Sequence, residues 1–165
     1  MKPARKVKMF GANAHEILPG LWLGNRAASQ DVAWLKEKGI ETVFNATKDA
    51  PFAPGVKHAY RIPVDDNLEP VEIANMRRWA PEAVLKILRE YKTGRPLLVH
   101  CHAGMQRSAA LVAMTLIAHK DYDAEKAMKY VRDRRPVAFF PVANFKDAIT
   151  GFESDFKGNL GTPIQ

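Results

Sequence analysis

Residues 98–108 read LVHCHAGMQRS and place four chemically useful residues at fixed spacings. Cys101 is followed by Gly104 three residues later, by Arg107 six residues later and by Ser108 seven residues later. An arginine fork holds two phosphate oxygens at once, and a glycine lets backbone amides approach an anion closely. The segment therefore indicates a site where a phosphate group faces a nucleophilic thiol.

Two elements must position this segment. Residues 97–100 form a short apolar run typical of a buried central strand, and residues 107–120 form an apolar helix. A loop that ends at a helix N-terminus directs its N–H groups toward one point, and the helix dipole adds positive potential there. The Cys101 thiol is expected to lose its proton readily in this position, and Ser108 can donate a hydrogen bond to the thiolate.

Each of these residues also has an ordinary structural explanation. A lone cysteine at a strand end is usually a small core hydrophobe, and His100 could be a core histidine. His100 and His102 flank Cys101 and suggest a metal site, but neighbouring strand residues point to opposite faces, which is poor ligand spacing. The joint spacing between a strand and a helix is far more specific and favours the phosphate site.

The other segments alternate in type, which predicts an α/β fold. The expected strands span residues 16–23 (a strand pair), 42–44 and 58–64, and the expected helices span residues 29–38, 70–92, 124–134 and 142–156. Asp31 falls in the first turn of its helix, and Asp123 is the expected N-cap of another. Pro81 predicts a kink or a break inside the helix of residues 70–92.

Composition excludes several protein classes. The chain has 165 residues, of which 47% are apolar and 26% are charged, as in a single globular domain. One cysteine excludes an internal disulfide, and the longest apolar stretch, residues 109–118, is too short for a bilayer. Lys and Arg number 25 against 18 Asp and Glu, and the net charge of +7 favours anionic partners without choosing among them.

The basic surplus is partly concentrated at the start of the chain. Before the first acid at Glu16 stand the four basic residues Lys2, Arg5, Lys6 and Lys8. No apolar core follows them, so a secretory signal is excluded, and the lack of serine makes a mitochondrial presequence the weaker alternative. We expect residues 1–14 to form a mobile basic segment, residues 15–157 the catalytic domain, and residues 158–165 a tail.

The segment HCxxGxxRS resembles the signature of the cysteine-dependent protein phosphatases. Ala103-Gly104 together with Ser108 is most similar to the dual specificity branch, in its small atypical form. The resemblance runs from about His15 to Phe156 and includes the family's opening strand pair, first helix-to-strand passage, general-acid loop and C-terminal motif, at residues 16–24, 39–45, 62–66 and 135–145. It implies a central mixed, mostly parallel sheet of four to five strands with helices on both faces.

The resemblance also implies a role for each residue of the site. Cys101 would be the nucleophile that forms a cysteinyl-phosphate, Ser108 would assist its breakdown, and His100 would orient the loop. The phosphoryl oxygens would be held by the Arg107 side chain and by the backbone amides of His102, Ala103, Gly104, Met105, Gln106 and Arg107. No metal and no cofactor are implied.

Two neighbouring aspartates compete for the role of general acid. The family spacing from Ile62-Pro63 places the acid at the fifth position, which is Asp66 and not Asp65. Asp66 would protonate the leaving oxygen and later activate water. The alternative for either residue is a solvated loop aspartate.

Three functions are compatible with this pattern. The first is a protein phosphatase acting on phosphotyrosine and on phosphoserine or phosphothreonine, in an intracellular, cytoplasmic setting. The second is the same chemistry on a non-protein phosphate, such as an inositol phosphate or an RNA 5′-triphosphate. The third is a phosphopeptide-binding module without catalysis, which the presence of Cys101, Arg107 and Asp66 does not favour.

Charged and aromatic residues bear on the second alternative. The loop contains no lysine that would bind a second phosphate, and Arg132, Arg134 and Arg135 are expected on the solvated face of a helix. Binding of RNA needs exposed aromatics near the cleft. Phe139 and Phe140 could serve, but we expect core packing for at least one, so nucleic acid is not the favoured partner.

Overall fold

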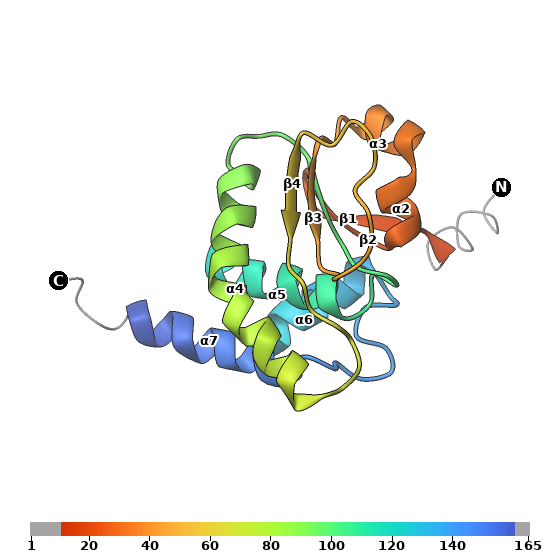
Figure 1. Cartoon of the computed structure of the whole chain (residues 1–165). Helices are drawn as coiled ribbons and strands as arrows, with labels where there is room; N and C mark the ends of the chain where they lie inside the picture. Colours follow the sequence, from red (N-terminus) through yellow and green to blue (C-terminus); the bar gives the residue numbers. More distant parts are fainter. Residues whose placement is uncertain (1–10, 161–165) are drawn as a thin grey trace.

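The structure, a computed structural model, describes residues 11–160 (Figure 1). Most of the expected basic segment, with Lys2, Arg5, Lys6 and Lys8, lies outside the described residues, as do residues 161–165 of the expected tail. Each helix within residues 11–160 is too short or too polar to cross a membrane.

A five-stranded sheet forms the centre of the molecule. Its strands are β1 (Ala14–Leu18), β2 (Leu21–Gly24), β3 (Thr42–Asn45), β4 (His58–Arg61) and β5 (Leu97–His100). The spatial order is β1-β2-β5-β3-β4, with β1 antiparallel to β2 and all other pairs parallel. β5 is the central strand and all four of its residues are buried, as its apolar run predicted.

Helices cover both faces of this sheet (Figure 1). One face carries α2 (Arg26–Gln30) and α3 (Val32–Lys38); the other carries α4 (Pro70–Tyr91), α5 (Arg107–Lys120), α6 (Ala124–Arg134) and α7 (Lys146–Leu160). A small apolar core with Leu35, Val43 and Leu98 lies under α3, and a larger one surrounds α5. The predicted mixed sheet with helices on both faces is confirmed.

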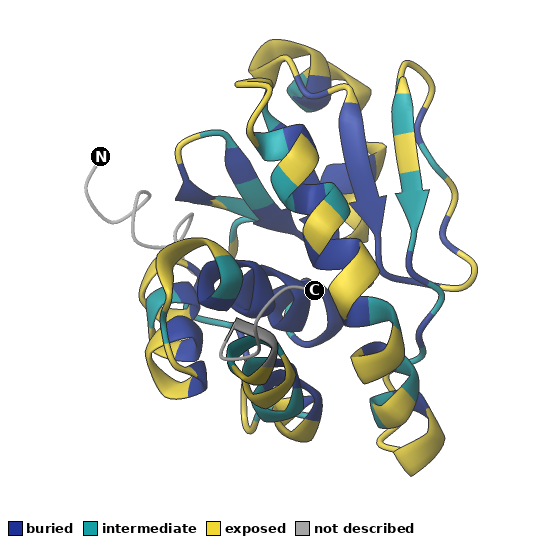
Figure 2. Ribbon diagram, turned by 90° about the vertical axis from the view of Figure 1, so that its left-hand side faces the viewer, coloured by how far each residue is buried: buried dark blue, intermediate teal, exposed yellow. Residues whose placement is uncertain are grey.

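The helix α5 is buried on every side. The sheet lies on one side of it, and α4, α6 and α7 pack around the others, so that residues 107–117 are all buried (Figure 2). A helix apolar all round belongs in such a place. Because α5 begins where β5 has just ended, the connection between them opens at the carboxyl edge of the parallel strands, where α/β folds bind their ligands.

The expected helix of residues 29–38 is in fact two helices. Asp31 separates α2 from α3 and accepts a hydrogen bond from the Trp34 N–H at 3.0 Å through its side chain. This is the geometry of an N-cap, whose preference for aspartate competes with helix continuation. Asp31 therefore does not lie in the first turn of one helix, whereas Asp123 caps α6 as predicted.

Three other boundaries differ from expectation. The predicted break at Pro81 is wrong, because α4 runs unbroken for 22 residues. Pro81 lies on its exposed side, where water can hydrate the carbonyl that loses its helical partner. β4 ends at Arg61 and not at residue 64, and the last helix begins at Lys146 and not at residue 142.

Candidate active site

Cys101 is the first residue after β5 and lies at the base of a tight loop. Its side chain is buried, and Sγ lies 3.1 Å from Oγ of Ser108 in the first turn of α5. Residues 102–106 make the connection, so the strand and the helix hold the two ends of the loop as the sequence predicted. A hydroxyl at this distance can donate a hydrogen bond to a thiolate.

Gly104 allows the loop to curl. Its φ of +67° is a left-handed conformation that other residues rarely adopt. A Cβ at this position would lie 2.5 Å from the Gly24 carbonyl oxygen and 2.8 Å from Nη2 of Arg135. The loop therefore packs directly against the end of β2, with no room for a side chain.

Arg135 is buried against this loop and binds its backbone. The predicted solvated position is wrong: Arg135 is 1% exposed. Its guanidinium donates to the Gly104 carbonyl at 2.7 Å, to the Ala103 carbonyl at 3.2 Å and to the Ala12 carbonyl at 3.0 Å. Burial lowers the pKa of Arg135, whereas the charge of Cys101 acts in the opposite direction. The buried cation thus orders the loop and adds positive potential near the thiol.

Arg107 connects the loop to the segment that carries the expected acid. Its Nη1 donates to the Val64 carbonyl at 2.9 Å, and the residue is 7% exposed. Its Nε is buried and has no hydrogen-bond partner among the described residues. An unpartnered donor on an oriented guanidinium is suited to an anion such as a phosphoryl group.

The two aspartates that compete for the acid role have different partners. Asp66 Oδ1 accepts a hydrogen bond from Asn144 Nδ2 at 3.0 Å, whereas Asp65 Oδ2 lies 3.2 Å from Lys48 Nζ. The Asn144 backbone N–H donates to Gln106 Oε1 at 2.9 Å, within the loop itself. Asp66 is therefore linked to the phosphate loop, and Asp65 is directed toward a lysine.

The last two residues of the loop support the segment after α6. Gln106 Nε2 donates to the Val142 carbonyl at 2.8 Å, and the Phe139 N–H donates to the Met105 carbonyl at 2.7 Å. Phe139 is buried, as expected for one of the two phenylalanines, and Phe140 is 67% exposed. Gln106 is occupied by these contacts and leaves its backbone amide for an anion.

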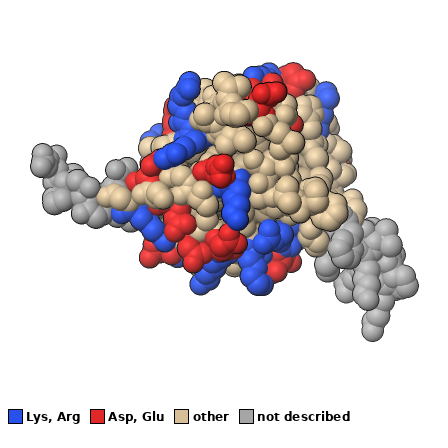
Figure 3. Space-filling view, turned by 90° about the horizontal axis from the view of Figure 1, so that it is seen from below, with Lys and Arg blue, Asp and Glu red and all other residues tan. Residues whose placement is uncertain are grey.

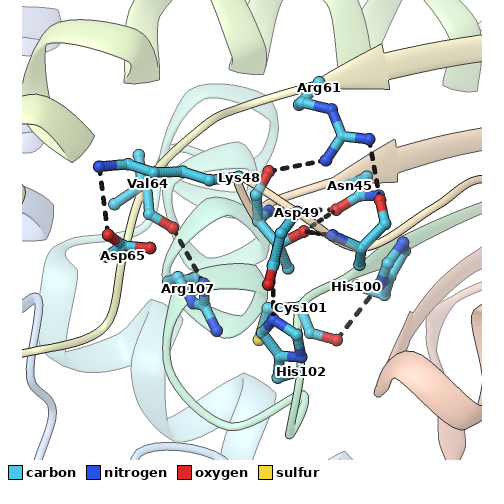
Figure 4. A network of polar contacts seen from close by, with 12 residues as sticks. Asn45, Lys48, Asp49, Arg61, Val64, Asp65, His100, Cys101, His102 and Arg107 are labelled. Atoms are coloured by element: carbon cyan, nitrogen blue, oxygen red, sulfur yellow. Dashed lines mark hydrogen bonds and ion pairs between the residues drawn. The ribbon is translucent and has the colours of Figure 1, made fainter.

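The two histidines that flank Cys101 have separate environments (Figure 4). His100 is fully buried, with Nδ1 3.2 Å from the Cys101 carbonyl, and this burial lowers its pKa to about 4, so it is neutral near pH 7. His102 Nε2 lies 3.0 Å from Asp49 Oδ1, and this hydrogen bond lowers the pKa of Asp49. Among residues 11–160, no group of three histidine, cysteine, aspartate or glutamate side chains is placed to hold a metal ion.

Several residues of the site were not found from the sequence. They are Lys48, Asp49, Asn144 and, in its supporting role, Arg135. Lys48 and Asp49 lie in a segment without periodicity, and Arg135 ends a run of charges. The only signal for Arg135 and Asn144 was their membership of the C-terminal motif.

The family model described as "Dual specificity phosphatase, catalytic domain" matches residues 21–155. The chain belongs to this family. The resemblance stated from the sequence is thereby confirmed. Dual specificity protein phosphatase 2 of Mus musculus is 37% identical over 123 residues, which are 74% of this chain and 37% of that protein. The chain thus spans less than half the length of this curated relative.

Solved structures of the family superpose closely on this dual specificity phosphatase domain. Human DUSP28 has a TM-score of 0.76 at 26% identity and covers 88% of this chain and 95% of its own. The human tyrosine phosphatase-like serine/threonine/tyrosine-interacting protein has a TM-score of 0.75 at 27% identity. This match covers 87% of this chain and 97% of the other chain. Both matches therefore include most of this chain and nearly all of the other chain.

Proposed function

We propose that the protein removes phosphate from phosphotyrosine and from phosphoserine or phosphothreonine in proteins, through a cysteinyl-phosphate intermediate. One observation carries the proposal: the buried Cys101 Sγ, 3.1 Å from Ser108 Oγ, lies in a loop closed at its other end by the buried Arg107. The family membership supports the same reaction. A cytoplasmic setting with phosphorylated proteins as partners is part of this proposal.

The first step transfers the phosphoryl group to the enzyme. The Cys101 thiolate attacks phosphorus, an S–P bond forms, and the bond to the leaving oxygen breaks. Asp66 gives its proton to that oxygen, so the leaving group departs as a neutral hydroxyl. The loop amides and Arg107 hold the three equatorial oxygens, whose charge the helix dipole of α5 also stabilises.

The second step releases phosphate. The Asp66 carboxylate takes a proton from water, the oxygen attacks phosphorus, and the S–P bond breaks to return the thiolate. Ser108 donates a hydrogen bond to the departing sulfur and makes it a better leaving group. His100, which is buried and neutral, holds the Cys101 carbonyl and takes no part in proton transfer.

Short connections around the site support a shallow mouth. Residues 62–69 form the whole connection from β4 to α4, and residues 135–145 form that from α6 to α7. A shallow mouth accepts the short phosphoserine and phosphothreonine side chains as well as phosphotyrosine. Arg107 serves one phosphoryl group, and the loop offers no second cation, which disfavours inositol polyphosphates and RNA 5′-triphosphates.

One face of the molecule gives no separate support for nucleic acid. On the face seen in Figure 3, basic and acidic side chains are interspersed and form no patch of one sign. Phe140 is exposed beside the loop, but its neighbour Phe139 is buried, so a stacking platform of two aromatics is not formed by this pair.

A substrate panel tests the proposal. Specificity constants are measured for phosphotyrosine, phosphothreonine and phosphoserine peptides, an inositol phosphate and a 5′-triphosphorylated RNA, at low and near-physiological salt. We expect the peptides to be the better substrates at both. If an inositol phosphate or the RNA exceeds every peptide at the higher salt, the substrate class is wrong and the cysteine chemistry stands. If none is hydrolysed, a binding module is the better description.

A further inference from the structure

We propose that Lys48 is a positioning residue, which holds Asp65 away from the reacting phosphate and so leaves the acid role to Asp66. The inference rests on the proposed function, because it names what sets the general acid. Lys48 is neither in the phosphate loop nor in the acid loop. It belongs to the turn at the end of β3, here called the β3 turn and defined as residues 45–50, of which Asn45 is also the last residue of the strand.

The β3 turn is rigid. Asn45 Oδ1 accepts from the Thr47 N–H at 3.1 Å and from its hydroxyl at 2.7 Å, and Asn45 Nδ2 donates to the Ala50 carbonyl at 2.8 Å. Arg61, at the end of β4, donates to the Thr47 and Ala50 carbonyls at 3.0 and 2.8 Å. Because Asn45 and Thr47 are fully buried, the backbone that carries Lys48 is fixed.

Lys48 reaches from this turn to two carboxylates, and Figure 4 shows its contact with one of them, Asp65. Its Nζ lies 2.6 Å from Glu72 Oε2 in α4 and 3.2 Å from Asp65 Oδ2 in the acid loop. The Glu72 side chain is only 8% exposed, and its hydrogen bond from Lys48 lowers its pKa. Glu72 thus anchors the ammonium, and the ammonium draws Asp65 to the side of the loop where α4 begins.

The same stretch of α4 fixes the backbone before the aspartates. Asn75 Nδ2 donates to the Pro63 carbonyl at 3.1 Å and to Glu72 Oε1 at 3.1 Å. With Arg107 bound to the Val64 carbonyl, the chain is held up to residue 64. At the aspartates the Glu72 carboxylate also takes a backbone hydrogen bond from Asp65. The two carboxylate side chains are then oriented by Lys48, which contacts Asp65, and by Asn144, which contacts Asp66.

Loss of Lys48 should therefore change the direction of two neighbouring carboxylates. Freed from Lys48, Asp65 can turn toward the site, and Asp66 spends less time in the geometry for proton donation. General acid catalysis matters most for leaving groups that are poor without a proton. A defect of positioning should consequently appear as a greater dependence of rate on the leaving group, and not as a uniform loss.

The test compares Lys48→Met with Lys48→Arg and with a matched control. The control is Lys57→Met, which removes another lysine–carboxylate ion pair, with Glu41 at 2.7 Å, in a more exposed position just before β4. Specificity constants are measured for aryl phosphates of graded leaving-group acidity and for a phosphotyrosine peptide. For Lys48→Met we expect about tenfold loss on the peptide and less than about twofold on the most activated ester. Lys48→Arg should restore most of the peptide activity, and Lys57→Met should behave as the wild type.

Two further variants keep the test decisive. Lys48→Met leaves the mostly buried Glu72 carboxylate without its cation, so Lys48→Met/Glu72→Gln replaces it if the single variant does not fold. In an Asp65→Asn background, Lys48→Met should cause no additional loss on the peptide, because the two residues act through one contact. Full additivity, or an equal loss on all esters, would overturn the inference. A wild-type chain inactive on every ester would instead reject the proposed function, and the inference with it.

Discussion

The side-chain amide of Asn144 donates a hydrogen bond to Asp66 Oδ1 at 3.0 Å, across 78 positions of the chain. The Asn144 backbone N–H is itself bound to Gln106 in the phosphate loop. One asparagine thus places a carboxylate of the acid loop relative to the loop that carries Cys101. This relationship distinguishes Asp66 from Asp65 in space, where the sequence distinguished them only by a family spacing.

Replacement of the proposed acid should affect poor leaving groups most. A general acid contributes about 10²–10⁴-fold, so Asp66→Asn should lower phosphopeptide hydrolysis by at least about 10²-fold and that of an activated aryl phosphate far less. It should also flatten the alkaline limb of the pH–rate profile. Asp65→Asn should cost about tenfold or less. If Asp65→Asn shows the larger loss and the flattened limb, the acid has been assigned to the wrong residue.

Cys101→Ser should abolish turnover and preserve binding. The hydroxyl cannot replace the thiolate as a nucleophile, whereas the loop amides and Arg107 remain in place. Phosphotyrosine-peptide hydrolysis and peptide binding by fluorescence anisotropy give the two readouts. Residual hydrolysis above a few per cent of wild type would contradict a covalent mechanism through this sulfur.

Arg135→Lys should destabilise the protein although the charge is kept. A lysine cannot donate to the three carbonyls that the planar guanidinium serves, and buried carbonyls without partners cost about 1–3 kcal/mol each. We expect the free energy of unfolding in urea to fall by about 2–3 kcal/mol, with a parallel loss of activity. The adjacent, exposed Arg134→Lys serves as the control and should change stability by less than about 0.5 kcal/mol. Equal effects of the two substitutions would contradict the role of Arg135.

Burial of His100 should make stability depend on pH. Burial lowers its pKa from 6.5 to about 4, so between these values the unfolded chain holds the proton and the folded one does not. The contribution of neutral His100 to the free energy of unfolding is fully present above pH 6.5 and is lost as the pH falls toward 4. This contribution amounts to at most about 3 kcal/mol. Urea unfolding between pH 4.5 and 7 should show a shallower dependence for His100→Asn than for wild type. Identical slopes would show that folding does not lower the pKa of His100.

Sequence patterns predicted an element well where neighbouring residues determine its structure. The run at residues 97–100 and the apolar helix from Arg107 to Lys120 were predicted with their observed bounds, because burial on all sides leaves an unmixed apolar pattern. The break between α2 and α3 at Asp31 was missed because an N-cap can end one helix and begin the next without changing the spacing of apolar residues. At Pro81 the tendency of proline to break a helix was outweighed by the packing of the rest of α4.

Contacts between distant segments could not be predicted from such patterns. Arg135 ends a series of charged residues that faces water, and its burial depends on carbonyls 31 and 32 residues away. Lys48 and Asn144 likewise acquire their partners only when the β3 turn and the segment before α7 meet the acid loop. The types and spacing within residues 98–108 indicated the chemistry, but the residues that orient it come from distant parts of the chain.

The contacts of Arg135 also decide when the phosphate loop loses its conformational freedom. Ordering a residue costs roughly 1–2 kcal/mol in backbone entropy. Because the guanidinium holds the carbonyls of Ala103 and Gly104 in the protein itself, this cost is met during folding and not when an oxyanion arrives. A phosphate ion or a transition-state mimic then meets a preorganised cradle, and its binding energy adds directly to the stability of the fold.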